Sequence, residues 1–457
     1  MNALDRASIE ALIARGDIDT VVCATPDIWG RLMGKRVTGR TFLKTALGDE
    51  GLHGSLYVFV VDMDMDPRPG FALTSWDTGY HDCHYAPDLS TLHRVPWHDK
   101  TAMVLCDLRD EHSGAPVAVS PRAILKRQVE AAAALGFGVK CASELEFFLF
   151  KDSFEAAWHK EYQGLDPTST YRGDYHILQS AKDEPFLQAV RRHLDDIGIE
   201  IEFSKTEWGL GQQEINLRYT DAIEMADRHA LYKNAIKELA AQAGLSATFM
   251  AKPWAHEIGS SCHLHTSLWS ADGATPLSWD GNAPGHMSAA FGAFVAGQLE
   301  RTRELAFLVG HTVNAYKRFR PESFAPTAIA LGDDNRTCGF RLCGHGPSFR
   351  VENRIPGADA NPYLAIAASI AAGLDGIRRK LKAPEIYRAN AYRDAALPRV
   401  PMALHEALPL FEQSAFAREA LGAEVHAHLA NFGRQELAAF DHECVTDWER
   451  KRYFERI

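Results

Sequence analysis

The sequence predicts an α+β protein with two domains, a smaller one over residues 1–112 and a larger one over residues 113–457. A chain of 457 residues is longer than one hydrophobic core normally holds. Its first part combines one helical pattern with short apolar runs and turns, whereas the second part alternates apolar runs with long helical patterns. The stretch HSGAPVAVSP separates the two parts.

The smaller domain is expected to begin with an amphipathic helix inside MNALDRASIEALIARGDID. Strands are expected at DTVVCATP, YVFVVDMDM and TAMVLCDL, because these runs are rich in β-branched and aromatic residues and are bounded by turn residues. Asp62, Asp64 and Asp66 lie at and just beyond the end of the second run, and we interpret them as a solvated or interface strand in preference to a ligand site.

The larger domain is expected to begin with a helix that has Ser120 as its N-cap and Pro121 as its first residue. Asp221 and Glu224 form a capping-box-like start to a second long helix. A third helix is expected to begin at residues 361–362, where Asn precedes Pro. Between these helices lie apolar runs that predict strands.

Charge and cysteine usage narrow the class of protein. The net charge of −11, with acidic and basic residues mixed along the chain, argues against nucleic-acid or membrane partners, which select a basic face. The eight cysteines are scattered and form no CxxC pair, which is typical of reduced thiols in a cytoplasmic protein. The first residues do not resemble a signal peptide, and no apolar run reaches the roughly 18 residues that a membrane span needs.

Four of the expected strands carry carboxylates, imidazoles and arginines on one face, because residues two apart in a strand point the same way. The four faces comprise Glu144 and Glu146 in KCASELEFFLF; Gln212, Glu214, Asn216 and Arg218 in GQQEINLRY; Ser261, His263, His265 and Ser267 in SSCHLHTSLW; and Arg350, Glu352 and Arg354 in SFRVENRIP. A strand with one side in water explains any one of these faces. Together they indicate a site, because neighbouring carboxylates repel unless a cation lies between them.

The residue types also indicate which ligands such a site takes. Glutamates with one histidine suit Mg²⁺ or Mn²⁺, and arginines beside them suit a phosphate-bearing anion. The sequence contains neither GxxxxGK[ST] nor a strand–GxGxxG–helix pattern, so a nucleotide would be held through metals and arginines.

Six stretches, in order, resemble the glutamine synthetase family in its bacterial type I-like branch: SELEFFLF, EWGLGQQEI, KPWAHEIGSSCHLHTSL, NAYKRF, DNRTCGFR and FRVENRIPGADANPYL. The resemblance covers nearly the whole chain. It implies an N-terminal β-grasp domain followed by a glutamine synthetase/guanido-kinase-like catalytic domain, in which helices surround an antiparallel barrel-like sheet. It also implies a homo-dodecamer of two stacked hexameric rings, with active sites between subunits.

The resemblance implies roles for individual residues. One metal ion would be held by Glu146, Glu207 and Glu214, a second by Glu144, His263 and Glu352, with two or three Mg²⁺ or Mn²⁺ ions in each site. ATP would lie near His265, Ser267, Arg350 and Arg336; L-glutamate near Gly259, Arg318, Arg354 and His263; and the transferred phosphoryl group near Arg336 and Arg341. Structural ion pairs remain the alternative for Arg341, Arg350 and Arg354. The implied reaction phosphorylates the γ-carboxylate of glutamate, and an amine then displaces phosphate.

Two positions depart from family members that use ammonia. By the resemblance, His53 replaces an aspartate and Phe324 replaces a glutamate, and in the ammonia-using members these two acids bind ammonium. Losing both acids removes a cation site and favours an organic amine, with His53 as its base. The aspartates near Asp62 favour a polyamine such as putrescine, while a monoamine, ethanolamine or aniline also fits. The alternatives are an ammonia-using glutamine synthetase that relies on Glu322, and an inactive structural or nitrogen-sensing relative.

Overall fold

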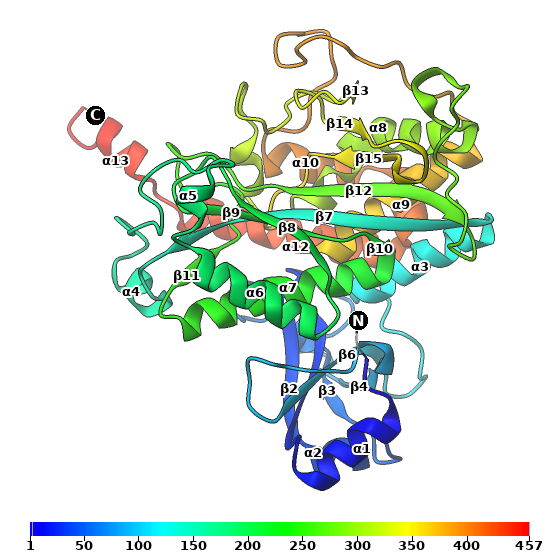
Figure 1. Cartoon of the computed structure of the whole chain (residues 1–457), viewed down its shortest axis with the longest axis vertical. Helices are drawn as coiled ribbons and strands as arrows, with labels where there is room; N and C mark the ends of the chain where they lie inside the picture. Colours follow the sequence, from blue (N-terminus) through cyan, green and yellow to red (C-terminus); the bar gives the residue numbers. More distant parts are fainter. Residues whose placement is uncertain (2, 457) are drawn as a thin grey trace.

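The computed structural model describes residue 1 and residues 3–456, and it places a smaller N-terminal unit against one side of a larger unit (Figure 1). The smaller unit contains a mixed six-stranded sheet with the order β2-β1-β6-β4-β3, and β5 pairs with β6. Its strands are β1 (Thr20–Pro26), β2 (Leu32–Thr38), β3 (His53–Ser55), β4 (Asp82–Pro87), β5 (His93–Arg94) and β6 (Thr101–Asp110). Only β1 and β6 run parallel, and this pair forms the middle of the sheet.

Two helices of the smaller unit, α1 (Arg6–Arg15) and α2 (Gly39–Lys44), pack beside the sheet. The carboxylate of Asp5 accepts the backbone N–H of Ser8 and begins α1, while Gly16 ends it with a φ of 74° that glycine adopts without strain. The predicted helix and the predicted strands at residues 19–26 and 101–108 are confirmed.

The predicted strand at YVFVVDMDM is wrong. Residues Leu56–Phe59 form the 3₁₀ helix η1, and the aspartates that follow lie in a turn. The carboxylate of Asp62 accepts the backbone N–H groups of Asp64 and Asp66 and pairs with Arg68. Such local bonds compete with strand pairing, which explains why an apolar run was not sufficient to make a strand.

The larger unit is built on a nine-stranded sheet that is nearly closed and barrel-like, with the order β13-β14-β15-β12-β7-β9-β8 and with β10 and β11 pairing with β7. Its strands are β7 (Phe137–Phe150), β8 (Ile201–Thr206), β9 (Gln212–Leu217), β10 (Thr220–Asp221), β11 (Ser246–Thr248), β12 (Cys262–Ser270), β13 (Leu331–Asp333), β14 (Phe340–Cys343) and β15 (Arg350–Asn353). All pairs are antiparallel except β13 with β14. The α+β class and the mainly antiparallel sheet of the larger unit are therefore confirmed.

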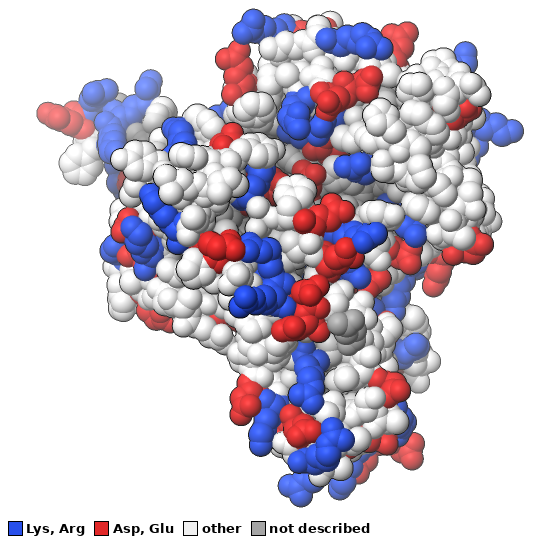
Figure 2. Space-filling view, viewed as in Figure 1, with Lys and Arg blue, Asp and Glu red and all other residues white. Residues whose placement is uncertain are grey.

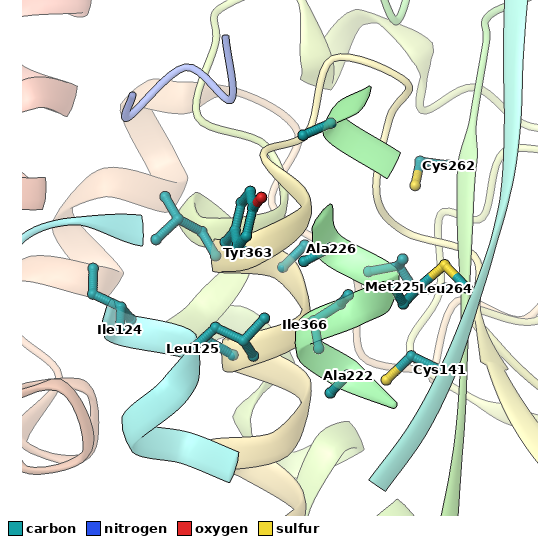
Figure 3. Packing of buried hydrophobic residues seen from close by; sticks show 14 of the residues in the cluster. Ile124, Leu125, Cys141, Ala222, Met225, Ala226, Cys262, Leu264, Tyr363 and Ile366 are labelled. Carbon is teal, nitrogen blue, oxygen red and sulfur yellow. The ribbon is translucent and has the colours of Figure 1, made fainter. Parts of the chain in front are cut away.

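Helices cover this sheet on its apolar face. The larger unit's helices are α3 (Pro121–Ala134), α4 (Phe154–His159), α5 (Ile177–Ser180), α6 (Glu184–Asp196), α7 (Ala222–Gln242), α8 (Ala289–Val309), α9 (Pro362–Arg378), α10 (Leu404–Glu412), α11 (Ala415–Leu421), α12 (Ala423–Glu443) and α13 (Asp447–Tyr453), of which α3 and α7 contact the sheet directly and α13 stands off the body (Figure 1). The remaining 3₁₀ turns are η2 (Leu89–Thr91) in the smaller unit and η3 (Pro284–His286), η4 (Ala315–Arg318) and η5 (Gly346–Ser348) in the larger one. Figure 3 shows side chains of α3, α7 and α9 packing together, with Met225 directed toward Leu264 of β12.

The caps of the larger unit's helices were predicted only in part. Asn361 caps α9 as expected, because its side chain accepts the backbone N–H groups of Tyr363 and Leu364. Ser120 and Asp221 precede their helices but make no side-chain cap bond. Glu224 instead accepts a bond from the N-terminal ammonium group at 2.7 Å, so the predicted capping box is wrong: a long-range ion pair takes the carboxylate that a local cap would use.

The predicted boundary between residues 112 and 113 falls in the connection from β6 to α3. A buried arginine joins the two units there. Arg122 of α3 bonds Asp88 and Asp107 of the smaller unit and Asp227 of α7, at 2.6 to 3.0 Å. No described helix is long and apolar enough to cross a membrane. The eight cysteines are free thiols in the structure.

Candidate active site

The four predicted polar faces lie side by side on one surface of the larger sheet. Strand register pairs Glu146 with Glu214, Glu144 with His263, and Glu352 with His265. The opposite face of the same strands holds the buried apolar residues of the core, as the alternation in the sequence predicts. Side chains from β9, β7, β12, β15 and β14 therefore converge on one surface.

This surface lines a cavity of about 1010 Å³. The cavity contains every predicted site residue except His53: Glu144, Glu146, Glu207, Glu214, Gly259, His263, His265, Ser267, Arg318, Phe324, Arg336, Arg341, Arg350, Glu352 and Arg354. Acidic and basic side chains alternate down the middle of the face shown in Figure 2, without a continuous basic surface of the kind that binds nucleic acid.

Glu146, Glu207 and Glu214 form the first of two acidic groups, with carboxylate oxygens within 4.8 Å of one another. Ser261 fixes Glu146 through its backbone N–H at 2.8 Å and its hydroxyl at 2.5 Å. Burial, together with Glu207 and its neighbours, raises the pKa of Glu214 to about 10 and that of Glu146 to about 7. The raised pKa values reflect burial and the mutual repulsion of these carboxylates. A divalent cation bound between them would relieve that repulsion.

Glu144, His263 and Glu352 form the second group. The His263 Nδ1 atom lies 3.2 Å from Glu144 and 3.4 Å from Glu352. Burial alone would raise the pKa of Glu352, but His263 and Arg354 outweigh it and lower that pKa to about 2. The group therefore offers ionised oxygens and one imidazole, a donor set that fits Mg²⁺ or Mn²⁺.

A chain of hydrogen bonds orients the second group. Arg350 Nε donates to His265 Nδ1 at 3.0 Å, so His265 Nε2 carries the proton and donates to Glu144 at 2.9 Å. The alternative ion pair between Arg350 and Glu352 is not formed. Arg350 thus holds an imidazole and, through it, a carboxylate of the second group.

The other arginines of the cavity are paired to different degrees. Arg341 bonds Glu352 at 2.9 Å and also pairs with Asp334. Arg354 donates to Glu352 at 2.5 Å, so the ion pair considered from the sequence is present for both residues. Arg354 Nε, however, is buried without a partner. Arg336 is exposed and forms no ion pair within the described part of the chain.

Arg318 lies deep in the wall, where it donates to the backbone carbonyls of Arg354 and Pro356 at 2.8 and 2.9 Å. Gly259 lies against it. A Cβ atom on Gly259 would come within 2.6 Å of the Ala251 carbonyl oxygen and 3.0 Å of Arg318 Cγ, so only glycine fits here. Packing of the arginine therefore explains the glycine, and both line the cavity.

The segment RFRPESFAP closes one side of the cavity. Phe324 has a φ of 60° and its side chain is 62% exposed, a costly combination for an aromatic residue that suits a loop built to meet a ligand. Its carbonyl accepts a bond from Arg354 at 3.3 Å. Glu322 points elsewhere and pairs with Arg393 at 3.0 Å.

His53 is the one predicted site residue that the chain does not bring to its own cavity. It lies on β3 of the smaller unit, where Nδ1 bonds Glu111 at 2.9 Å. The aspartates near Asp62 also lie outside the cavity lining.

The structure adds residues that sequence reasoning did not identify. Lys205 of β8 pairs with Glu207 and lies 4.3 Å from the ring of Tyr175. Asp334, next to β13, holds Arg341. The only sequence signal for Lys205 was its place two residues before Glu207. The sequence had no signal for Asp334, because its partner Arg341 lies on another strand.

A family model described as the glutamine synthetase catalytic domain matches residues 118–453. A gamma-glutamylethanolamide synthetase of Streptomyces coelicolor is 48% identical over 449 residues, which are 98% of this chain and 95% of that protein. A glutamate–isopropylamine ligase of a Pseudomonas species is 38% identical over 452 residues, 98% of each chain. The solved GmaS/ADP complex has a TM-score of 0.84 and 29% identity over 98% of this chain and 99% of that one. This chain is therefore a ligase of the glutamine synthetase family, in the branch of the glutamate–amine ligases.

Proposed function

We propose that this enzyme uses ATP to join the γ-carboxylate of L-glutamate to a small organic amine through a γ-glutamyl phosphate. One observation carries the choice of an organic amine: Phe324, an aromatic side chain, lines the cavity, and by the family resemblance it replaces an ammonium-binding glutamate. Ile258 and Ala325 line the same cavity and add apolar surface. Glu322 lies outside the cavity lining and faces Arg393 at the surface, which supports leaving it out of the amine site.

The residues of the cavity have separate tasks in this proposal. Divalent cations held by the two acidic groups would neutralise the phosphates of ATP. Arg336 and Arg341 stabilise negative charge as the phosphoryl group moves to the γ-carboxylate. His265, Ser267 and Arg350 lie where ATP would bind. The unpaired Nε of Arg354 supports a role in binding a glutamate carboxylate, with Arg318, Gly259 and His263 nearby.

The amine that we favour is a small monoamine such as ethanolamine. Two relatives are named for ethanolamide synthesis and for isopropylamine. Asp62 gives little support to a polyamine such as putrescine, since Arg68 and backbone N–H groups occupy its carboxylate.

The remaining expectations stay proposals: a cytoplasmic homo-dodecamer of two stacked hexameric rings, with two or three Mg²⁺ or Mn²⁺ ions in each site. Large apolar side chains that are more than half exposed support burial against further copies. They include Trp158, Tyr171, Tyr175, Ile177 and Leu178.

The function is tested by phosphate release from ATP with L-glutamate and a panel of amines: ethanolamine, methylamine, isopropylamine, aniline, putrescine and ammonia. We expect kcat/KM for the best small monoamine to exceed that for ammonia by at least about 100-fold, as loss of both acids implies. Equal rates with ammonia and the best amine would contradict the proposal.

Phe324→Glu should move the preference toward ammonia. Tyr162→Glu is the matched control, because Tyr162 is also an exposed aromatic with positive φ (57°) but lies outside the cavity. If Phe324→Glu changes the amine preference no more than Tyr162→Glu does, Phe324 is only a packing residue.

A further inference from the structure

Lys205 lies on the wall of the main cavity, where other side chains enclose its ammonium group. It belongs to β8, and its side chain is 13% exposed. The Nζ atom pairs with Glu207, lies 3.6 Å from Asp174 Oδ1 and lies 4.3 Å from the centre of the Tyr175 ring. Carboxylates and an aromatic face are the groups with which proteins bind an alkylammonium ion. Asp174, Tyr175 and Glu207 therefore form a cation subsite, and the lysine fills it.

The loop that carries Asp174 and Tyr175 is fixed against the end of β8. The backbone N–H of Asp174 donates to the Glu207 carbonyl at 3.1 Å. A Cβ atom on Gly173 would come within 2.5 Å of Thr206 Oγ1, so the loop approaches the strand more closely than a larger residue would allow. Tyr175 has a φ of 63° and a side chain that is 71% exposed, so a strained backbone directs its ring away from the core. The cation subsite is therefore built by the backbone.

The cation subsite belongs to the cavity in which the amine is to react. Asp174, Tyr175, Lys205 and Glu207 all line this cavity, as does Phe324. A free ammonium ion, or the second ammonium group of a diamine, would need the carboxylate oxygens that Lys205 already contacts. Such an ion would also be repelled by Lys205, because a lysine carries a full positive charge at neutral pH. The lysine therefore excludes a second cationic group from this part of the cavity.

We propose that Lys205 is a specificity-determining residue: its ammonium group fills the cation subsite in place of a ligand, so that the enzyme rejects ammonium ions and diamines and accepts an amine with an uncharged substituent. The inference rests on the proposed function and deepens it. Phe324 accounts for an acid that the cavity lacks, whereas Lys205 accounts for the acids that remain, because it occupies them.

The first experiment measures kcat/KM for ethanolamine, ammonia and putrescine in the wild type, Lys205→Ala and Lys205→Met. Alanine empties the cation subsite, whereas methionine removes the charge but keeps most of the side-chain volume. We expect the ratio of kcat/KM for putrescine to that for ethanolamine to rise by about 10-fold or more in Lys205→Ala and by less than about 2-fold in Lys205→Met, and ammonia should gain in the same way. Equal changes in the two variants would mean that Lys205 only balances the charge of Glu207. That result, or an unchanged ratio in both variants, would overturn the inference.

The second experiment measures binding without catalysis. The thermal midpoint of the metal-free protein is recorded in EDTA with putrescine dihydrochloride, against sodium chloride at the same ionic strength. We expect putrescine to raise the midpoint of Lys205→Ala by about 1–2 °C, and to leave the wild type and Lys205→Met unchanged. Adding Asp174→Asn to Lys205→Ala should abolish the rise, because one carboxylate of the subsite is then neutral. Lys205→Ser is measured beside Lys205→Ala, so that a folding defect in one small variant does not decide the result, and no rise in either would overturn the inference.

The matched control is Lys126→Ala. Lys126 is also a partly buried lysine between two carboxylates, with Asp107 at 2.5 Å and Asp88 at 3.9 Å, but it lies outside the cavity lining. We expect this variant to keep the amine preference of the wild type and to show no rise in thermal midpoint with putrescine. A shift as large as that in Lys205→Ala would mean that loss of any paired lysine has this effect, and it would count against a subsite at Lys205.

The outcomes separate the two proposals. If the wild-type enzyme ligates none of the amines on the panel, the proposed function fails. If it ligates amines but Lys205→Ala behaves as Lys126→Ala does, the proposed function stands and only the role of Lys205 in specificity is lost.

Discussion

Two buried clusters of charge in this protein look alike in composition but differ in balance. At the contact between the units, Asp88, Asp107 and Asp227 surround Arg122. In the cavity, three glutamates surround one another, and Lys205 at their edge pairs with Glu207 and, at 3.6 Å, with Asp174. The first cluster contains its own cation, whereas the second lacks one at its centre.

The pKa values express this difference. Burial by itself would raise the pKa of Asp88, but Ser90 and Arg122 lower it. Burial would lower the pKa of Arg122, but Asp227 and Asp107 raise it. Asp227, the most buried of the three aspartates, has a raised pKa, because burial outweighs its bond to Arg122. In the cavity, burial and mutual repulsion raise the pKa of Glu214 to about 10. A cluster whose buried charges are balanced by its own cation is suited to a structural role. A cluster of buried carboxylates without a cation at its centre indicates a ligand site.

The largest effect is expected from Glu214→Gln. We predict that amine-ligase activity falls by about 1,000-fold, because a ligand to a divalent cation is lost. The thermal midpoint of the metal-free protein should stay the same or rise, since the wild-type carboxyl is already protonated near neutral pH. Phosphate release measures the loss of activity, and calorimetry in EDTA measures the thermal midpoint of the metal-free protein. A lower midpoint in the metal-free variant would mean that Glu214 has a structural role.

Arg122→Met should have the opposite profile. Removing the buried guanidinium leaves Asp227 uncompensated, and we expect the free energy of unfolding to drop by about 3–5 kcal/mol. Ligase activity per folded molecule should stay close to wild type. Urea unfolding measures the first quantity and kcat the second, and a marginal stability loss would contradict the structural role.

The pH dependence of the metal-free protein sharpens the same contrast. The folded-state pKa values of Glu146 and Glu214, about 7 and about 10, lie above the ordinary glutamate value of 4.5. Their contribution to stability is therefore complete below about pH 4.5 and is lost as the pH rises through these values. We expect the Mg²⁺-induced rise in thermal midpoint to be larger at pH 8 than at pH 6, and a pH-independent rise would contradict the assigned repulsion.

The smallest effect is expected from Arg379→Ala. Arg379 pairs with Glu300 and Asp375 on the surface, where solvent screens the charges. Neither the thermal midpoint nor kcat should change measurably. A clear loss of stability would contradict the view that exposed ion pairs in this protein contribute less than buried ones.

The sequence by itself determined which side chains share a face. The two-residue period of a strand places Glu144 with Glu146, and His263 with His265, whatever the tertiary structure. It did not determine what happens after the apolar run that ends at Val61, because local bonds to Asp62 made a turn there. The family resemblance supplied the division of these side chains into two metal-binding groups.

Only the tertiary structure decided which charges are compensated. Arg350 bonds His265 and leaves Glu352 to Arg341 and Arg354. Sequence spacing fixes the direction of a side chain along one strand. Hydrogen bonds and ion pairs depend on distances of about 3 Å between separate elements, and packing alone sets those distances.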